Sequence, residues 1–357
     1  MMDDDLRQSL LDAPPDRIAV LRYRFIGDTL LSLPFLKTLR RSAPKAHITL
    51  LTGPECVELM RQCPYVDEVV AFEPRQDGWL KSLGILRKGR YDRAYILKRS
   101  LSSALLVRLA GISERIGFGT EGRSWLLTQS VRYRPDEVHE ATCFMDLLGI
   151  STNYTRLELD AVDWLARPAP LSKLPDPLPQ PLVVLHTTST NPAKCWPIES
   201  FTTLARDLIN GFDAHLLFLG TQADNPTVQL LMANLTAEQR ARCTNLCGKT
   251  NLSDSMALLR HVHLVVGNDS GMIHMAAAMN RPVVALFGPA DPVQWAPIPR
   301  DQTMVEVATV DNLKCRPCRM RISCGHQYPC MTDLTPQSVL HLCKPILMNR
   351  QLYRQTP

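Results

Sequence analysis

Short apolar runs alternate along the first half of the chain with segments whose apolar residues recur at helical spacing. The apolar runs predict strands, and the segments of helical spacing predict helices. The predicted strands are residues 17–23, 48–51, 69–72 and 91–97. The predicted helices are residues 28–41, 55–62, 79–88, 102–110 and 138–148. Because strands that alternate with helices form parallel βαβ units, this half is expected to be an α/β domain.

A proline-rich segment, residues 168–181, interrupts this alternation. Proline fixes its own φ and has no N–H to donate to a helix or a ladder, so the segment predicts a semi-stiff linker. We therefore expect an acidic leader at residues 1–16, a first domain at 17–167, the linker at 168–181 and a second domain at 182–357. The second domain is expected to contain a cysteine-rich loop and a C-terminal helix.

A second alternating series follows the linker. Its predicted strands are residues 182–186, 214–219, 243–246, 264–266 and 283–287. Its predicted helices are residues 199–209, 226–235, 253–260 and 272–279. A chain of 357 residues is also too long for one comfortable core. The sequence therefore predicts two Rossmann-like, doubly wound parallel-sheet domains, with a cleft between them as the natural site for two substrates.

Composition narrows the class of protein. Hydrophobic residues make up 45% and charged residues 21% of the chain, which is typical of a soluble globular protein. The formal net charge of +5 permits an anionic substrate or a membrane surface. No aromatic residues interleave with a basic stripe, so we expect no nucleic-acid partner. The acidic N-terminus does not resemble a signal peptide, and no run approaches the ~20 apolar residues that cross a bilayer, which predicts a cytoplasmic location.

The most informative polar turn is Gly267-Asn268-Asp269-Ser270-Gly271, between a predicted strand and a predicted helix. Free backbone N–H groups and the helix dipole at such a helix start attract a phosphate or pyrophosphate. Asp269, Ser270, Gly271 and His274 fall in the turn or the first helical turn and would face the same ligand. The alternative is that these are ordinary N-cap residues, which most such turns contain.

Three further turns follow predicted strands. Gly27 allows a sharp turn before Asp28, but a dinucleotide-binding turn would have three glycines, which argues against a nicotinamide or flavin enzyme. Lys194 follows a run of hydroxyl-bearing residues and is either a pyrophosphate ligand or a solvated surface lysine. Asp224 either binds ribose hydroxyls or caps a helix, and Asp28 is likewise either a site carboxylate or a cap.

Four of the eleven cysteines cluster in one segment. They are spaced Cys315-x2-Cys318-x5-Cys324-x5-Cys330. Four thiolates can hold a structural zinc ion, which would leave no open position for catalysis. Loop thiols, or disulfides formed on oxidation, are the alternatives.

Taken in order, these segments resemble the heptosyltransferase family, glycosyltransferase family 9. The resemblance extends from Arg17 to about Cys343. It rests on RYRFIGDTLLSLPFLKTLRR, TNPAKCWP, LCGKTNLSDSMALLRHVHLVVGNDSGMIHMAAAMNRPVVALFGPADP and CRPCRMRISCGHQYPCM. The resemblance implies the GT-B architecture and an inverting, metal-independent transfer of heptose, or a related sugar, from a donor such as ADP-heptose. It also implies a lipopolysaccharide-core or other glycolipid or oligosaccharide acceptor, no required cofactor, and at most peripheral contact with the inner membrane.

The same resemblance implies roles for individual residues. Asp28 matches the family's general base, and Lys194 matches its phosphate-binding lysine. Asp224 stands where the family often has glutamate. The family's donor-binding turn is matched by Asp269, Ser270, Gly271 and His274. The hydroxyl-bearing residues before Lys194 also belong to the implied donor site, without separate roles: Thr188, Ser189 and Thr190.

Several basic residues lie at strand ends of the first domain: Arg22, Arg24, Lys98 and Arg99. Of these, Arg24 is favoured as an acceptor ligand, together with Gly27. Two other classes of function stay open from the sequence. One is a nucleotide-sugar-binding protein without catalysis, and the other is a GT-B-like nucleotide-sugar epimerase.

Overall fold

The structure is a computed structural model that describes residues 15–22, 25–150, 169–298, 305–318, 324–325 and 327–349. The chain divides into two compact units, Met1–Leu159 and Asp160–Pro357. Most of the predicted leader, and Arg24, lie outside the described residues. The predicted linker contains a 3-10 helix at Leu171–Lys173, and its role as the domain boundary stays a prediction. Among the helices that the structure describes, none has the length and apolar character needed to cross a bilayer.

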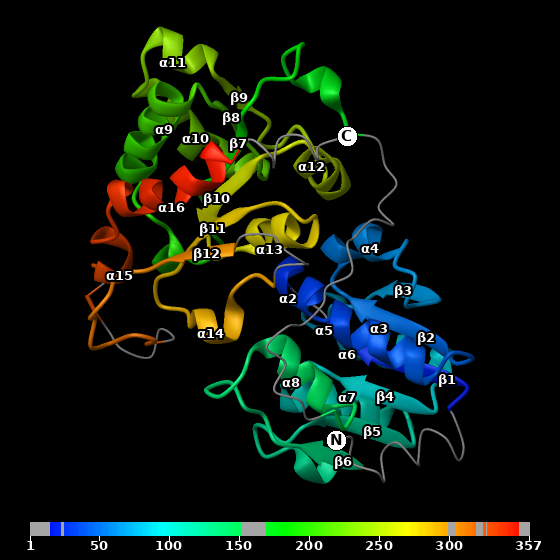
Figure 1. The fold of residues 1–357 in the computed structure, drawn as a ribbon. Coiled ribbons are helices and arrows are strands. Elements are labelled where there is room, and N and C mark those ends of the chain that lie inside the picture. The colour runs from blue at the N-terminus through cyan, green and yellow to red at the C-terminus, as the bar shows by residue number, and fades with distance from the viewer. Residues whose placement is uncertain are drawn as a thin grey trace. The chain divides into compact units, whose positions relative to one another are not determined.

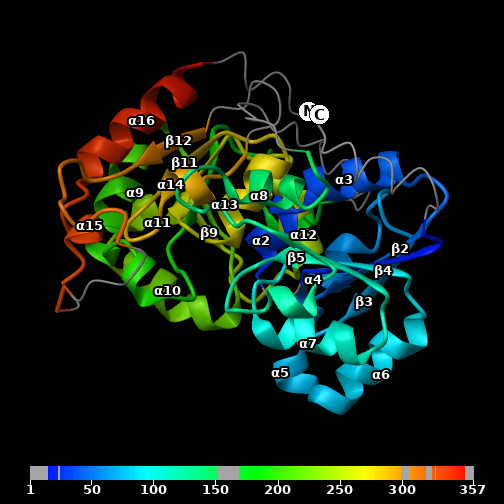
Figure 2. The same cartoon turned by 90° about the horizontal axis from the view of Figure 1, so that it is seen from below.

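The first unit contains a six-stranded parallel sheet in the order β3-β2-β1-β4-β5-β6 (Figure 1). The strands are β1 (Arg17–Leu21), β2 (His47–Thr52), β3 (Glu68–Ala71), β4 (Arg93–Ile96), β5 (Glu114–Phe118) and β6 (Gln129–Val131). The helices are α2 (Ile26–Leu31), α3 (Leu33–Ser42), α4 (Pro54–Met60), α5 (Pro74–Asp77), α6 (Trp79–Gly89), α7 (Leu101–Leu109) and α8 (Glu140–Asp146). Figure 2 shows α3 and α8 on one face of this sheet and α5, α6 and α7 on the other. The unit is therefore doubly wound.

The sequence pattern explains most of this unit. Residues 18–21 of β1 are fully buried, as expected for a central strand of a parallel sheet that is covered on both faces. The predicted helix at residues 28–41 is instead two helices that meet at Ser32. Pro34 lies in the first turn of α3, where its missing N–H has no intrahelical partner to lose, so a new helix begins there.

The second unit repeats the architecture with the parallel order β12-β11-β10-β7-β8-β9. The strands are β7 (Leu182–His186), β8 (His215–Phe218), β9 (Cys243–Asn245), β10 (Leu264–Asn268), β11 (Val283–Leu286) and β12 (Val305–Ala308). The helices are α9 (Ile198–Phe212), α10 (Asn225–Ala233), α11 (Ala237–Ala241), α12 (Leu252–Leu259), α13 (Gly271–Ala278), α14 (Pro292–Trp295), α15 (Pro329–Thr332) and α16 (Pro336–Met348). Both views show α9, α10 and α16 on one face of the sheet and α12 and α13 on the other.

The central strands of the second unit approach each other closely at Gly267 in β10. A Cβ atom at this position would lie 2.9 Å from His186 Cβ and 3.1 Å from the His186 carbonyl oxygen on β7. Gly267 therefore permits the β7–β10 pairing at the carboxyl ends of the two strands. The polar turns that follow these strands are held close together as a result.

Candidate functional site

Asp28 lies in the first turn of α2, just after the carboxyl end of β1. The residue before this helix, Phe25, has a φ of 65°, which is rare for a bulky residue and usually marks a constrained turn. The side chain of Asp28 is 22% exposed and forms a short ion pair with the guanidinium of Arg22. The carboxylate is thus reachable from solvent on one side and held by a cation on the other.

Arg22 is buried beside this carboxylate. Its guanidinium carbon lies 5.8 Å from the centroid of the Phe144 ring. Burial lowers the pKa of Arg22 to about 10, and the nearby Glu140 carboxylate opposes the shift. Arg22 is therefore still charged at neutral pH and gives Asp28 a permanent counter-ion. Sequence reasoning favoured Arg24 over Arg22, and Arg24 lies outside the described residues.

A second cluster of polar side chains in the first unit connects the segments that follow β4 and β6 with the start of α8. The Arg99 guanidinium stacks 4.4 Å from the centroid of the Tyr133 ring and donates to its hydroxyl. That hydroxyl donates in turn to Glu140 Oε2 at 2.6 Å. Burial, followed by the charge of Glu140, raises the pKa of Tyr133, so it remains a hydroxyl donor. Neither Tyr133 nor Glu140 was predicted as a site residue, because Tyr133 follows a stretch without a regular pattern and Glu140 lies in the predicted helix at residues 138–148 without a recognisable motif.

In the second unit, Lys194 and Asp269 meet although 75 residues separate them. Lys194 Nζ lies 2.5 Å from Asp269 Oδ2, and the two side chains are 24% and 7% exposed. Lys194 ends a 3-10 helix, Pro192–Lys194, that is capped by Asn191 Oδ1. Ser189 Oγ donates to the Asp269 carbonyl oxygen at 3.4 Å. The hydroxyl run and the glycine-rich turn are therefore brought together around an ammonium group.

Asn268 and Trp196 hold these two turns in place. The Trp196 backbone N–H donates to Asn268 Oδ1 at 3.0 Å. The Trp196 indole donates to the Leu334 carbonyl oxygen at 2.8 Å, and its ring packs edge-on against Phe201. Trp196 is thus a packing residue, and it anchors the chain that carries Lys194.

The start of α13 has polar groups that capping does not use. Ser270 is the N-cap residue of α13, but its side chain makes no capping hydrogen bond. Within the described part of the chain, Ser270 Oγ and Asn268 Nδ2 are buried and have no hydrogen-bond partner. Buried polar groups are normally paired, so these two atoms are available to hydrogen-bond a ligand at the start of α13. Gly271 opens the helix, and the buried His274 lies in its first turn.

The remaining candidate donor residues lie around the same sheet edge. Asp224 caps its turn, because its carboxylate accepts from the backbone N–H of Thr221 at 2.6 Å and from the Thr221 hydroxyl at 2.9 Å. These bonds form the capping box of the 3-10 helix Gln222–Asp224, whereas Asp224 makes no side-chain capping bond as the N-cap residue of α10. A ribose contact stays a prediction. Thr188 is half-buried, and Thr190 is exposed.

The four clustered cysteines are free thiols. Cys330 is buried, and burial together with the charges of Cys318 and Cys315 raises its pKa. Within the described residues, no group of three or more His, Cys, Asp or Glu side chains is arranged to hold a metal ion. The zinc interpretation therefore gains no support from this geometry and stays a prediction.

Comparison with known proteins shows which family this chain belongs to. A family model described as glycosyltransferase family 9 (heptosyltransferase) matches residues 80–324, more than half of the chain. The chain belongs to this family. It is therefore a glycosyltransferase, and the family match includes Lys194, Asp224 and the Asp269 turn. Asp28 precedes the matched residues.

Two heptosyltransferases align over nearly the whole chain. Lipopolysaccharide heptosyltransferase 2 of Escherichia coli K12 is 28% identical over 369 residues, covering 94% of this chain and 99% of that protein. Lipooligosaccharide heptosyltransferase 2 of Haemophilus influenzae is 28% identical over 354 residues, covering 92% and 99%. At these coverages both alignments extend well beyond residues 80–324.

Solved structures of family members share the fold. The structure of E. coli ADP-heptose lipopolysaccharide heptosyltransferase II matches with a TM-score of 0.75 and 26% identity, covering 94% of this chain and 99% of that chain. The family 9 glycosyltransferase of Veillonella parvula matches with a TM-score of 0.74 and 21% identity, covering 93% and 97%. The predicted GT-B architecture, with two doubly wound parallel units, is confirmed.

Proposed function

We propose that this glycosyltransferase moves a heptose from an ADP-heptose-like donor to a lipopolysaccharide-core acceptor, with inversion at the anomeric carbon. The observation that carries the proposal is the pairing of Lys194 with Asp269 at the start of α13. The names of its relatives, lipopolysaccharide and lipooligosaccharide heptosyltransferases, support the choice of sugar and acceptor.

The second unit is proposed to bind the donor diphosphate. Lys194 is the cation of this site, and the first backbone N–H groups of α13 add donors and a favourable dipole. The hydroxyl of Ser270, which has no hydrogen-bond partner among the described residues, can donate a hydrogen bond to a phosphate oxygen at this position. Lys194 and the helix start together supply the positive charge that the departing diphosphate needs, so we propose that the transfer requires no metal ion.

The first unit is proposed to supply the general base. As an acceptor hydroxyl oxygen attacks the anomeric carbon, Asp28 takes the hydroxyl proton, and the bond from that carbon to the diphosphate oxygen breaks. The electron pair of that bond leaves with ADP, so one bond forms and one breaks, and configuration inverts. The buried Arg22 fixes the orientation of Asp28 and leaves the carboxylate partly open to an incoming hydroxyl.

The proposed setting of the reaction is the cytoplasm. A glycolipid acceptor would be reached by peripheral contact of the protein with the inner membrane. The excess of basic residues is compatible with an anionic membrane surface.

Release of ADP tests the proposed function. Purified protein is incubated with ADP-heptose and with core oligosaccharide from a strain that lacks this enzyme, and ADP is measured with and without the oligosaccharide. The proposal predicts ADP release that requires the acceptor, together with a product heavier by one heptose. Donor binding without any transfer would favour a non-catalytic binding protein, and conversion of the donor to an isomer of the same mass, without net release of ADP, would favour an epimerase.

A further inference from the structure

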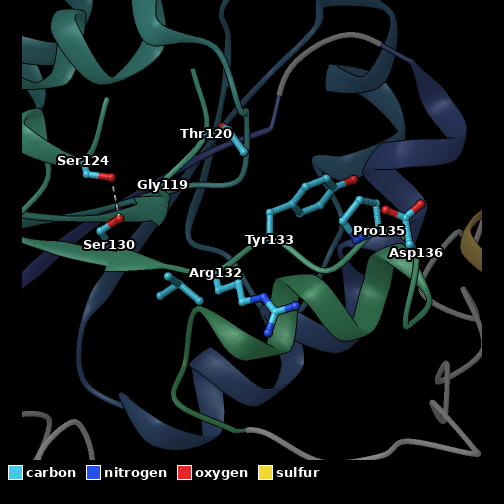
Figure 3. Close-up of a pocket in the computed structure, with 9 residues that line it drawn as sticks. Gly119, Thr120, Ser124, Ser130, Arg132, Tyr133, Pro135 and Asp136 are labelled. Atoms are coloured by element: carbon cyan, nitrogen blue, oxygen red, sulfur yellow. Dashed lines mark hydrogen bonds between the residues drawn. The ribbon is translucent and has the colours of Figure 1, made fainter. Parts of the chain in front are cut away.

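A cavity of about 610 Å³ opens in the first unit, where β5 and β6 end. Its volume falls in the range of about 300–1,000 Å³ that is usual for small-molecule sites. Figure 3 shows Ser124 and Ser130 on one side of it, Pro135 and Asp136 on the other, and the ring of Tyr133 between them. None of its lining residues is needed for the proton transfer proposed above.

The floor of the cavity is a fixed pair of hydroxyls. Ser130 Oγ donates to Ser124 Oγ at 3.1 Å (Figure 3). Both oxygens lie against Gly119, since a Cβ atom there would be 2.5 Å from Ser130 Oγ and 2.8 Å from Ser124 Oγ. Gly119 thus leaves room for the hydroxyl pair at the end of β5, and the pair is available to a ligand from the open side.

Tyr133 forms a rigid wall of the cavity. Its ring packs on Phe118 with centroids 5.1 Å apart, and the Arg99 guanidinium lies on it. Its hydroxyl is held by Glu140. A half-buried planar ring that is fixed by its neighbours presents its remaining apolar surface to the cavity at little cost in side-chain entropy.

The other lining groups bring both charges to the same cavity. Arg132 lines it and pairs with Glu137 on the exposed surface, and the Asp136 carboxylate lines it as well. Hydroxyl, carboxylate and guanidinium groups beside an aromatic ring match a sugar, whose hydroxyls donate and accept hydrogen bonds while its C–H groups are apolar.

The strand order relates this cavity to Asp28 within the same unit. All six strands are parallel, so β1, β5 and β6 present their carboxyl ends at one edge of the sheet. The cavity lies two to three strand positions from β1, which at the usual strand spacing is roughly 10–15 Å. That is the reach of a short oligosaccharide and is too far for the sugar ring that reacts at Asp28.

We propose that this cavity is a remote acceptor subsite, which binds a sugar of the acceptor separated from the reacting sugar by at least one glycosidic bond. The inference rests on the proposed function, because it needs an oligosaccharide acceptor. The subsite binds ground state and transition state alike, so it lowers KM for long acceptors and leaves kcat unchanged.

Filling the cavity tests this subsite. Ser130 is exposed on β6, where an aromatic residue suits a strand, so Ser130→Phe is expected to fold and to block the cavity. The matched control is Ser113→Phe, at an exposed position before the opposite end of β5. Transfer is measured with the complete core oligosaccharide and with a truncated acceptor that retains only the reacting sugar.

The expected result is a split between the two acceptors. Ser130→Phe raises KM for the complete oligosaccharide by about tenfold or more, because the hydrogen bonds of one sugar ring are lost, and it leaves kcat unchanged. The truncated acceptor reacts equally with wild type and variant, and Ser113→Phe changes neither. Equal effects of Ser130→Phe on both acceptors, or no effect on either, would overturn the subsite.

Direct binding separates failure of the subsite from failure of the proposed function. Saturation-transfer NMR measures binding of the complete oligosaccharide without any donor. If the wild-type protein transfers no sugar yet binds the oligosaccharide more tightly than Ser130→Phe, the subsite stands and the proposed reaction falls. If both proteins bind it equally, or if neither binds it, the subsite falls whatever the activity shows.

Discussion

Replacing Lys194 by methionine separates the structural role of the Lys194–Asp269 pair from its role in binding diphosphate. Methionine keeps most of the volume of the lysine stem and removes its charge. The Asp269 side chain, which is only 7% exposed, is then left without its cation. Both the free energy of unfolding and the affinity for ADP are therefore expected to fall.

The two losses have different magnitudes and different remedies. Breaking a fully buried pair costs about 3–5 kcal/mol, but Lys194 is 24% exposed and partly screened by water, so we expect a loss of about 2–3 kcal/mol in stability. Changing Asp269→Asn in addition removes the stranded charge and is expected to restore more than half of that loss. ADP affinity should drop about 10- to 100-fold in both variants, since a hydrogen bond to a charged group contributes about 1.5–3 kcal/mol.

Urea unfolding and titration calorimetry with ADP measure the two quantities. Lys344→Met, at an exposed position on α16 of the same unit, is the matched control and should change neither. The reasoning is refuted if Lys194→Met/Asp269→Asn binds ADP as tightly as wild type, because Lys194 would then contact no phosphate. Equal stability of wild type and Lys194→Met would show that Asp269 does not depend on this cation.

Two further predictions concern stability. Burial lowers the pKa of His263 from 6.5 to about 4, and its Nδ1 accepts from the Leu182 N–H, so the folded state disfavours the proton. The neutral His263 therefore contributes fully to stability above about pH 6.5, and this contribution is lost as the pH falls toward 4, by roughly 3 kcal/mol in all. In urea unfolding across this range, the free energy of unfolding of His263→Asn should change less with pH than that of wild type. Gly267→Ala should lower the free energy of unfolding by about 1–3 kcal/mol, because the new methyl group clashes with His186. The control is Gly211→Ala in α9, where nothing lies within 4 Å, and it should be neutral or stabilising in thermal unfolding. Equal effects of the two substitutions would contradict the close packing of β7 and β10.

The alternation of buried strands and amphipathic helices was sufficient to predict the doubly wound fold. β7 begins and ends at the predicted residues, because a buried apolar run followed by polar residues has clear limits. The strands β5 and β6 were not predicted, because neither has a continuous apolar run or strict alternation. β6 is a half-exposed edge strand, and β5, although it lies between β4 and β6, begins with two charged, half-buried residues. The predicted helix at residues 28–41 was wrong at Ser32, where the restart at Pro34 outweighed helical periodicity.

The candidate site was predictable only where its residues lie in recognisable turns. The turn at Asp269 and the position of Lys194 followed from strand ends and from the family resemblance. Arg22, Tyr133 and Glu140 have no local signature, because their roles arise from contacts between segments up to 118 positions apart, from Arg22 to Glu140. The sequence presents them as ordinary charged or aromatic residues.

Replacing Asp28 tests the central claim most directly. Asparagine keeps the shape of the side chain and a hydrogen-bond acceptor for Arg22 but cannot take up a proton. The account predicts that Asp28→Asn lowers the rate of heptose transfer in a single turnover by about 10²–10⁴-fold, while the Kd for the ADP-sugar donor stays within about twofold of wild type. Transfer by Asp28→Asn at the wild-type rate would contradict the account.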